Sequence, residues 1–136
     1  MTNIQQFSWP IRVYYEDTDA GGVVYHSNYL NFMERARTEW LRALGFEQTT
    51  LLNELGVMIV IHSLSIAFKS PARFNDALQV HCTLANAGRT SMDVTQAIYR
   101  DGVQLIEAQV KAVFVDAQSF RPVPIPPAIK QAMLTL

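Results

Sequence analysis

Apolar residues recur along the chain at two different spacings, and these spacings separate one helical segment from several strands. Between residues 28 and 44 the apolar positions follow helical spacing, which predicts a long helix. These positions are Tyr29, Phe32, Met33, Ala36, Trp40, Leu41 and Leu44. The first half is apolar over a wide arc, so we expect this helix to be deeply buried. Ser27 or Asn28 can cap its start, and Gly45 is a favourable C-terminal stop.

On both sides of this helix the pattern favours β-structure. Residues 7–15 carry β-branched and aromatic side chains and read as a strand. After the helix, Thr49 or Thr50 opens a short helical turn that ends before Gly56. Residues 57–69 then form an apolar run, which predicts a second strand. The side chains expected on one face of that strand are Val60, Leu64, Ile66 and Phe68.

Three later segments, within residues 78–84, 92–98 and 106–114, place their apolar side chains at alternate positions, as half-buried strands do. The Asp101-Gly102 pair between the last two is the strongest short hairpin signal in the chain. Prolines after residue 121 end the sheet, and residues 128–134 can form a terminal helical turn. There are no internal repeats.

The plan is therefore one strand, one long apolar helix and a meander of four strands, in a single domain over residues 1–136 of α+β class. A helix that is apolar on most sides and an antiparallel sheet bury each other best when the five-stranded sheet wraps around the helix. One helix cannot cover the whole sheet. We therefore expect a second copy of the chain to cover the remaining apolar surface, in a homo-oligomer.

Composition limits the classes of function. Half of the 136 residues are hydrophobic and the net charge is −1, with the Lys and Arg residues scattered, so a nucleic-acid surface is not expected. Residues 1–10 do not resemble a secretion signal, and no stretch predicts a membrane span. The single Cys82 excludes an internal disulfide, is expected in the core, and fits a reducing compartment, which predicts a cytoplasmic protein.

The chemistry of the chain is concentrated in residues 17–29, between the first strand and the helix. Asp17 and Asp19, the Gly21-Gly22 pair and His26 precede the helix start. A helix N-terminus presents unpaired N–H groups with a partial positive charge, and glycines let the backbone approach a ligand closely. A carboxylate beside such an end is a candidate nucleophile or base, and the end itself can polarise a carbonyl.

The run YEDTDAGGVVYH at residues 15–26, continued by Asn28-Tyr29 and by ERAR at residues 34–37, resembles the hot-dog-fold acyl-CoA thioesterases. The closer match is to the YbgC branch, relatives of 4-hydroxybenzoyl-CoA thioesterase. The segments KSPAR (69–73) and Val115-Asp116…Arg121-Pro122 extend the resemblance over nearly the whole chain. The family fold is a sheet wrapped around a long helix, paired as a dimer and often as a dimer of dimers, a homotetramer. Its sites lie at the dimer interface.

This resemblance implies roles for individual residues. The family aspartate falls on Asp19, which attacks the thioester or activates water. The backbone N–H that polarises the carbonyl falls on His26. The substrate contacts it implies are Tyr15, Gly21, Gly22, Val24, Tyr25 and, for the CoA phosphates, Arg89. The implied partner is acyl-CoA or an acylated carrier protein, with no cofactor.

The residues themselves allow other interpretations. Asp19 could instead be a loop residue bonded to its own backbone. The His26 side chain could orient a water, bind substrate or pack beside the helix, and Tyr15 could line the acyl pocket or belong to the core. Asp17 is expected to face solvent or cap a turn. Glu34 is expected to pair with Arg35 or Arg37, rather than act as the catalytic carboxylate.

His62 and His81 have no partner at metal-ligand spacing, so no metal is expected. The nearest rival enzyme is a hot-dog hydratase or dehydratase, but the six residues between Asp19 and His26 fit the thioesterase pattern better. A second rival is a non-catalytic acyl-CoA or carrier-protein binding module or scaffold of lipid metabolism. Hydrolysis would distinguish it, because a binder has no turnover.

Overall fold

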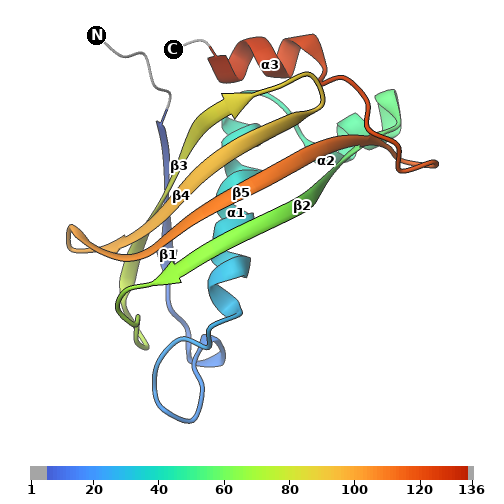
Figure 1. Cartoon of the computed structure of the whole chain (residues 1–136). Helices are drawn as coiled ribbons and strands as arrows, with labels where there is room; N and C mark the ends of the chain where they lie inside the picture. The colour runs from blue at the N-terminus through green and yellow to red at the C-terminus, as the bar shows by residue number, and fades with distance from the viewer. Residues whose placement is uncertain (1–5, 135–136) are drawn as a thin grey trace, which may run out of the picture.

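A five-stranded antiparallel sheet wraps around one long helix in the computed structural model of the chain, which describes residues 6–134 (Figure 1). The elements, in chain order, are β1 (Gln6–Arg12), α1 (Asn28–Ala43), α2 (Gln48–Thr50), β2 (Val57–Phe68), β3 (Ala77–Ala87), β4 (Ser91–Arg100), β5 (Val103–Asp116) and α3 (Pro127–Leu134). A 3₁₀ turn at Tyr15–Asp17 follows β1, and a π turn at Leu51–Leu55 precedes β2. The α+β hot-dog fold expected from the sequence is confirmed.

Helix α1 lies in the concave face of the sheet, as its apolar arc predicts (Figure 1). Phe32, Met33 and Ala36 have no solvent exposure, and Trp40 is nearly as buried. The helix ends where Gly45 adopts a positive φ of 96°, a conformation that favours glycine. No helix within residues 6–134 is both long and apolar enough to cross a membrane.

The strand order is β1-β3-β4-β5-β2. The expected meander of four strands is therefore wrong for β2, which does not lie beside β3. Strands β3, β4 and β5 form a meander, but β2 pairs with β5 at the edge opposite β1. The β2–β3 connection over residues 69–76 contains Pro71 and no two-residue hairpin turn, so it does not return the chain beside β2. It crosses instead toward β1 at the far edge of the sheet, beside the loop that precedes α1 (Figure 1).

A β-bulge in β2 changes which of its side chains face the helix. The pairing with β5 shifts between Ile61 and Ser63, where β2 carries an extra residue. Val60 therefore pairs with Val113 and faces away from α1, while Leu64 pairs with Val110 on the helix side. The single face expected for Val60, Leu64, Ile66 and Phe68 is wrong for Val60, because simple alternation cannot anticipate an inserted residue.

Two polar side chains lie between α1 and the sheet. Gln96 of β4 is 1 % exposed, donates to the Met33 carbonyl at 3.0 Å and to Cys82 Sγ at 3.2 Å, and accepts a 2.8 Å hydrogen bond from Arg37. Arg37 is thus bound to the sheet. Glu34 accepts from Thr38 at 2.5 Å, and within residues 6–134 it forms no ion pair with Arg35 or Arg37, so the expected pair is not formed. Burial raises the pKa of the Cys82 thiol to about 11, so the thiol is neutral, in agreement with its expected place in the core.

The β4–β5 turn and α3 match the sequence signals at the same residues, whereas the end of β1 does not. Asp101 and Gly102 both have positive φ, 51° and 79°, which confirms the hairpin predicted at this pair. Helix α3 forms where a terminal helical turn was expected. Strand β1 stops at Arg12 instead of reaching Tyr15, because the chain turns into the 3₁₀ segment at Tyr15–Asp17.

Candidate active site

Residues 18–27 form a tight loop that carries the chain from the 3₁₀ turn to α1. Thr18 pairs with Val24 as an isolated antiparallel bridge, and the Asp19 N–H donates to the Val23 carbonyl at 2.9 Å. The chain can reverse between these residues because Gly22 has a φ of 80°. The Val24 N–H also donates to the Ala72 carbonyl at 2.8 Å, which fixes the loop against residues 69–76.

Asp19 lies exposed at the tip of this loop. Its Oδ1 accepts a 2.8 Å hydrogen bond from the Gly21 N–H, so the carboxylate is bonded to its own backbone. A Cβ on Gly21 would lie 3.2 Å from the same oxygen, so only glycine leaves the carboxylate undisturbed. Its second oxygen stays available to a ligand: among residues 6–134 no other group hydrogen-bonds the carboxylate. The turn and a chemical role for Asp19 are therefore compatible.

Asp17 is buried, at 7 % exposure, and does not face solvent. The alternative expectation, that it caps a turn, is the one the structure supports. Its Oδ2 accepts from the Tyr14 N–H at 2.8 Å, which closes the 3₁₀ turn, and its Oδ1 accepts from Asn28 Nδ2 at 2.6 Å. Sequence inspection missed this burial because it depends on the return of the chain to Asn28.

The start of α1 has no side-chain cap. Ser27, its N-cap residue, has helical backbone angles and makes no capping hydrogen bond, so the predicted cap at Ser27 or Asn28 is wrong. Asn28 is committed instead to Asp17 and to Asn31. Within residues 6–134 nothing accepts the main-chain N–H of His26. This end of the helix therefore offers an N–H group and a favourable dipole to an incoming negative charge.

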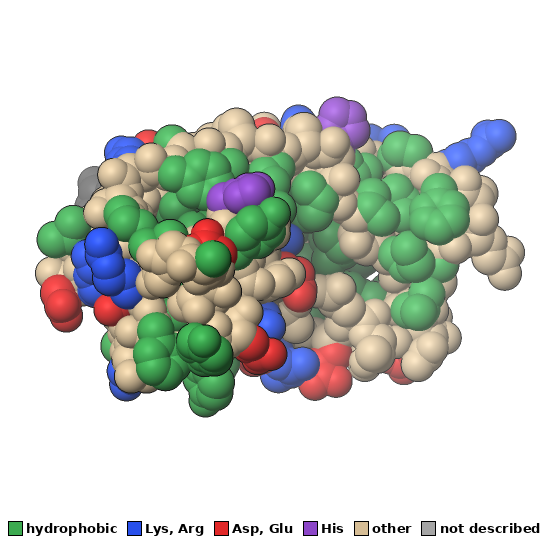
Figure 2. All heavy atoms as spheres, turned by 90° about the horizontal axis from the view of Figure 1, so that it is seen from below, with side chains coloured by type: hydrophobic (Ala, Val, Ile, Leu, Met, Phe, Trp, Pro, Cys, Tyr) green, Lys and Arg blue, Asp and Glu red, His purple; other side chains and the backbone are tan. Residues whose placement is uncertain are grey.

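A groove of about 290 Å³ opens beside this helix start. Its walls come from the loop, from α1 and from the end of β2: Val24, His26, Tyr29, Phe68, Lys69, Ser70 and Pro71. The Tyr29 ring packs edge-on against Phe68 with centroids 5.8 Å apart, and its hydroxyl accepts from the Ala72 N–H at 3.0 Å. Seen from this end, the molecule shows separate hydrophobic patches with charged side chains between them (Figure 2).

The Tyr29 hydroxyl in the wall of this groove is influenced by the charge of Asp19. Burial raises the pKa of the Tyr29 hydroxyl most strongly, and the negative charges of Asp76 and Asp19 raise it further. The hydrogen bond with Ala72 and the charge of Arg100 act in the opposite direction, but the net shift is upward. Tyr29 is thus a neutral hydroxyl in the wall of the groove, close enough to Asp19 to be influenced by its charge.

The other predicted contact residues lie at varying distances from this centre. Val24 is buried beneath the loop, and Tyr25 is half exposed with its ring 4.4 Å from that of His26. Tyr15 is 79 % exposed and packs edge-on against Phe74, so it is not a core residue of the chain. Arg89 lies in the β3–β4 turn, at the end of the sheet opposite the loop (Figure 1). A single chain does not bring Arg89 to Asp19.

Sequence inspection missed two groups that line the groove, the Tyr29 hydroxyl and Lys69. Tyr29 belongs to the apolar helical repeat, which gives no sign that its hydroxyl end reaches the loop at Ala72. Lys69 follows β2, and it reaches the site because residues 69–76 run beside the loop, where the Val24 N–H donates to the Ala72 carbonyl. Within residues 6–134 no three His, Cys, Asp or Glu side chains gather as metal ligands would.

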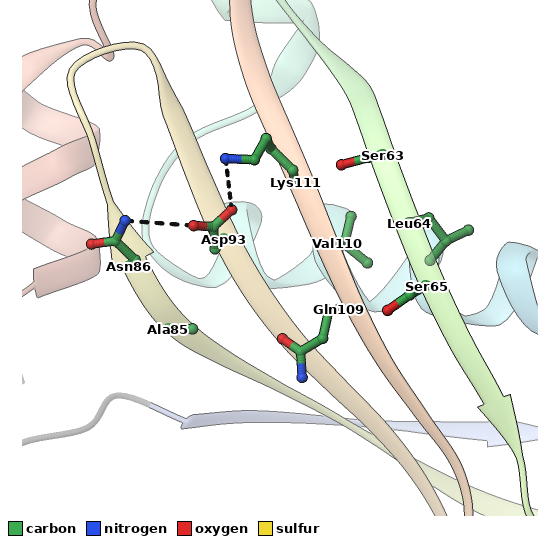
Figure 3. Close-up of a pocket in the computed structure, with 9 residues that line it drawn as sticks. All are labelled: Ser63, Leu64, Ser65, Ala85, Asn86, Asp93, Gln109, Val110 and Lys111. Carbon is green, nitrogen blue, oxygen red and sulfur yellow. Dashed lines mark hydrogen bonds and ion pairs between the residues drawn. The ribbon is translucent and has the colours of Figure 1, made fainter.

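A second hollow, of about 460 Å³, lies on the face of the sheet that points away from α1 (Figure 3). Ser63, Ser65 and Gln109 line it with hydroxyl and amide groups. Asp93, the one carboxylate among the described residues that line it, forms an ion pair with Lys111 at 3.3 Å and accepts a hydrogen bond from Asn86 at 3.5 Å (Figure 3). Because that carboxylate is already paired, this hollow lacks the free base that the loop presents at Asp19.

Comparison with known proteins gives a consistent answer. The family model described as "Thioesterase-like superfamily" matches residues 13–133. "Acyl-CoA thioesterase YbgC" of Haemophilus influenzae is 44% identical over 126 residues, covering 93% of each chain. "Acyl-CoA thioester hydrolase YbgC" of Escherichia coli is 43% identical over 128 residues, covering 93% of this chain and 95% of the relative. The crystal structure of a probable thioesterase from Bartonella henselae is 30% identical, covers 90% of this chain and all of its own, and has a TM-score of 0.86.

Proposed function

Since the chain belongs to the thioesterase-like superfamily and is an acyl-CoA thioester hydrolase of the YbgC type, we propose that Asp19 and the start of α1 carry out the hydrolysis. The observation that supports this assignment is the pairing of an exposed carboxylate with an unpaired N–H at His26, beside a groove. The carboxylate supplies the attack, and the helix start receives the charge that develops on the carbonyl oxygen.

Two routes are open to Asp19. As a nucleophile, it forms a C–O bond to the acyl carbon and releases the CoA thiolate, leaving a mixed anhydride that water hydrolyses. As a general base, it removes a proton from a water that attacks the same carbon. Both routes end in the free acid and CoA. A single turnover in ¹⁸O-water distinguishes them. In the nucleophilic route, water that attacks the aspartyl carbon of the anhydride leaves its ¹⁸O on Asp19, so the released acid carries no label. In the general-base route, water attacks the acyl carbon, so the released acid is labelled.

The His26 N–H is the proposed donor to the oxyanion. Because its partner forms only during the reaction, the interaction stabilises the transition state more than the substrate. Losing one donor of this kind typically costs about 3 kcal/mol. The His26 imidazole, exposed at the groove, has the second proposed role of holding the attacking water or the substrate.

The substrate contacts extend outward from these groups. Gly21 leaves room beside Asp19. Gly22, Val24, Tyr25 and Tyr15 are proposed to contact the acyl or pantetheine part. Arg89 lies at the other end of the sheet, so we propose that it contacts CoA held by a neighbouring subunit.

We also propose that the active form is a homo-oligomer built on β2. This strand is an edge of the sheet, and Ile61, Leu64 and Phe68 leave large apolar side chains exposed along it. A second β2 can pair with it antiparallel about a twofold axis, which would satisfy its free backbone groups and cover these side chains. Two such dimers give the homotetramer proposed from the resemblance.

The proposed location is the cytoplasm. Cys82 is the only cysteine of the chain, and it is a buried free thiol. A buried free thiol is typical of proteins in a reducing compartment. The proposed carrier is CoA, with an acylated carrier protein as the second carrier to test.

A hydrolysis screen tests the function. Free thiol release is measured with short, long and aromatic acyl-CoAs and with acylated carrier protein, using the purified full chain. We expect turnover with at least one acyl-CoA class. Tight binding with no thiol release would indicate a non-catalytic acyl-binding protein instead, and hydration of an enoyl-CoA would indicate a hydratase.

A further inference from the structure

Asp17 holds together three segments that surround the proposed reaction centre. Its Oδ2 accepts from the Tyr14 N–H at 2.8 Å, and its Oδ1 accepts from the side chain of Asn28 at 2.6 Å. Its main-chain carbonyl accepts from the Tyr25 N–H at 3.0 Å. The segment that follows β1, the return of the loop and the first residue of α1 therefore all bind to one residue.

These contacts enclose the segment that carries Asp19. The loop leaves Asp17 two residues before Asp19 and comes back to it at Tyr25, next to His26. The bridge between Thr18 and Val24 lies inside this closed loop. The relative position of the Asp19 carboxylate and the His26 N–H is thus set by the contacts that Asp17 makes at the two ends of the loop.

The Asp17 carboxylate is buried beside the start of α1. Among residues 6–134 no Lys, Arg or His forms an ion pair with Asp17, although it is 7 % exposed. Burying an unpaired carboxylate is costly unless hydrogen bonds and a favourable field compensate it. The two hydrogen bonds and the positive end of α1 supply that compensation, so the carboxylate also draws the first residue of α1 toward the loop.

We propose that Asp17 is a positioning residue for hydrolysis: through Asn28 and Tyr25 it sets the start of α1 against Asp19. This proposal rests on the proposed roles of Asp19 and His26. Asp17 does not touch the substrate. It acts by holding the Asp19 carboxylate and the His26 N–H in position, because both must reach the same substrate carbonyl. A small displacement of either group lowers the rate steeply.

The donor and acceptor pattern allows a reciprocal test. In Asp17→Asn, the new amide can satisfy Tyr14 through its oxygen, but its NH₂ group then faces the NH₂ group of Asn28. In Asn28→Asp, two carboxylates face each other. In the double variant Asp17→Asn/Asn28→Asp, the amide introduced at position 17 donates to the carboxylate introduced at position 28. That carboxylate can still accept from Asn31, so every contact is restored.

The measured quantities are kcat, KM and the melting temperature of each variant, with an acyl-CoA that the wild-type chain hydrolyses. Each single variant is expected to lower kcat by about tenfold or more with little change in KM, and the double variant to recover most of that loss. Asp116→Asn is the matched control. Asp116 caps a turn by accepting from the N–H groups of Gln118 and Ser119, so its loss should change stability but not kcat.

Folded single variants with wild-type kcat would overturn the proposal, as would a folded double variant no faster than the singles. If Asp17→Asn does not fold, Asn28→Ala decides. It removes the contact between Asp17 and α1, together with the hydrogen bond from Asn31, and leaves the contacts of Asp17 with Tyr14 and Tyr25 in place. An unchanged kcat in that variant contradicts positioning. Asp19→Asn is measured beside them. If it is inactive while the Asp17 variants are unaffected, only the positioning role fails; if it is fully active, the proposed function itself fails.

Discussion

The main-chain N–H of Gly21 donates a 2.8 Å hydrogen bond to Oδ1 of Asp19, and a side chain at Gly21 would begin 3.2 Å from that same oxygen. The turn that holds the carboxylate therefore also keeps the space beside it empty. The neighbouring Gly22 has a different role. It has a φ of 80° and open space around its Cα, so its contribution is conformational.

Gly21→Ala tests the space beside the carboxylate. A methyl group there presses on the Asp19 oxygen and displaces it, so kcat should fall by about tenfold or more, as expected when a reacting group is misplaced. The backbone is free to keep its conformation, and the melting temperature should change little. Steady-state kinetics and thermal unfolding of the same preparation measure both. A variant with wild-type kcat would show that the carboxylate tolerates crowding.

Gly22→Ala tests the turn. A Cβ at positive φ costs about 1–2 kcal/mol, so this variant should lower the free energy of unfolding by that amount, unlike Gly21→Ala. If the loop relaxes to avoid the strain, kcat falls as well, because Asp19 and His26 lie on either side of Gly22. Chemical denaturation gives the stability change. Unaltered stability and kinetics together would mean that the conformation of the loop at Gly22 matters neither for folding nor for hydrolysis.

Ile61→Glu and Leu64→Glu test the proposed oligomer. Each places a charge on the apolar edge strand β2, where a second β2 would have to bury it. Light scattering coupled to gel filtration should show a shift toward smaller species relative to the wild-type chain. Val103→Glu is the matched control, since Val103 is also exposed but lies at the start of β5, in the β4–β5 hairpin. A wild-type chain that is monomeric and active would contradict the oligomer.

Asp76 makes stability depend on acidity. Burial tends to raise the pKa of Asp76, but hydrogen bonds from the Arg73 N–H and the Arg100 guanidinium, with the charges of both arginines, outweigh it, so its pKa lies below the ordinary value for an aspartate. A depressed carboxyl pKa stabilises the fold above the pKa of the unfolded chain, and this contribution disappears as the pH falls through the folded value. Asp76→Asn should therefore lower stability at pH 7, and less so at pH 2.

Urea unfolding at the two pH values measures this difference. Asp101→Asn serves as the control, because Asp101 lies in an exposed hairpin turn where asparagine also accepts a positive φ. An Asp76→Asn deficit that is equally large at both pH values would show that the charge of Asp76 does not stabilise the fold.

Local signals in the sequence predicted the elements well. The helical repeat with Gly45 after it located α1 to within a residue, and the Asp101-Gly102 pair identified the last hairpin. Both features depend on interactions between close neighbours in the chain. The resemblance carried by residues 15–26 then predicted the fold class, because the family determines how such elements are arranged.

Features that depend on distant segments were not predictable. The place of β2 beside β5 and its bulge after Ile61 depend on pairing partners far along the chain. Gln96 looked like any residue of an alternating strand, yet it is buried because Arg37 and Met33 of α1 meet it. The same reason explains Asp17, whose burial requires Asn28, and Arg89, whose distance from Asp19 follows from the strand lengths.

The most direct test of the account is a single-turnover measurement on Asp19→Asn with an acyl-CoA that the wild-type chain hydrolyses. The substitution keeps the size of the side chain and the hydrogen bond from Gly21, but it removes the negative charge needed for attack or proton removal. We predict an unchanged fold and unfolding midpoint, retained binding of the acyl-CoA, and a loss of most of the hydrolysis rate. A folded Asp19→Asn chain that hydrolyses the bound thioester at close to the wild-type rate would contradict the assignment.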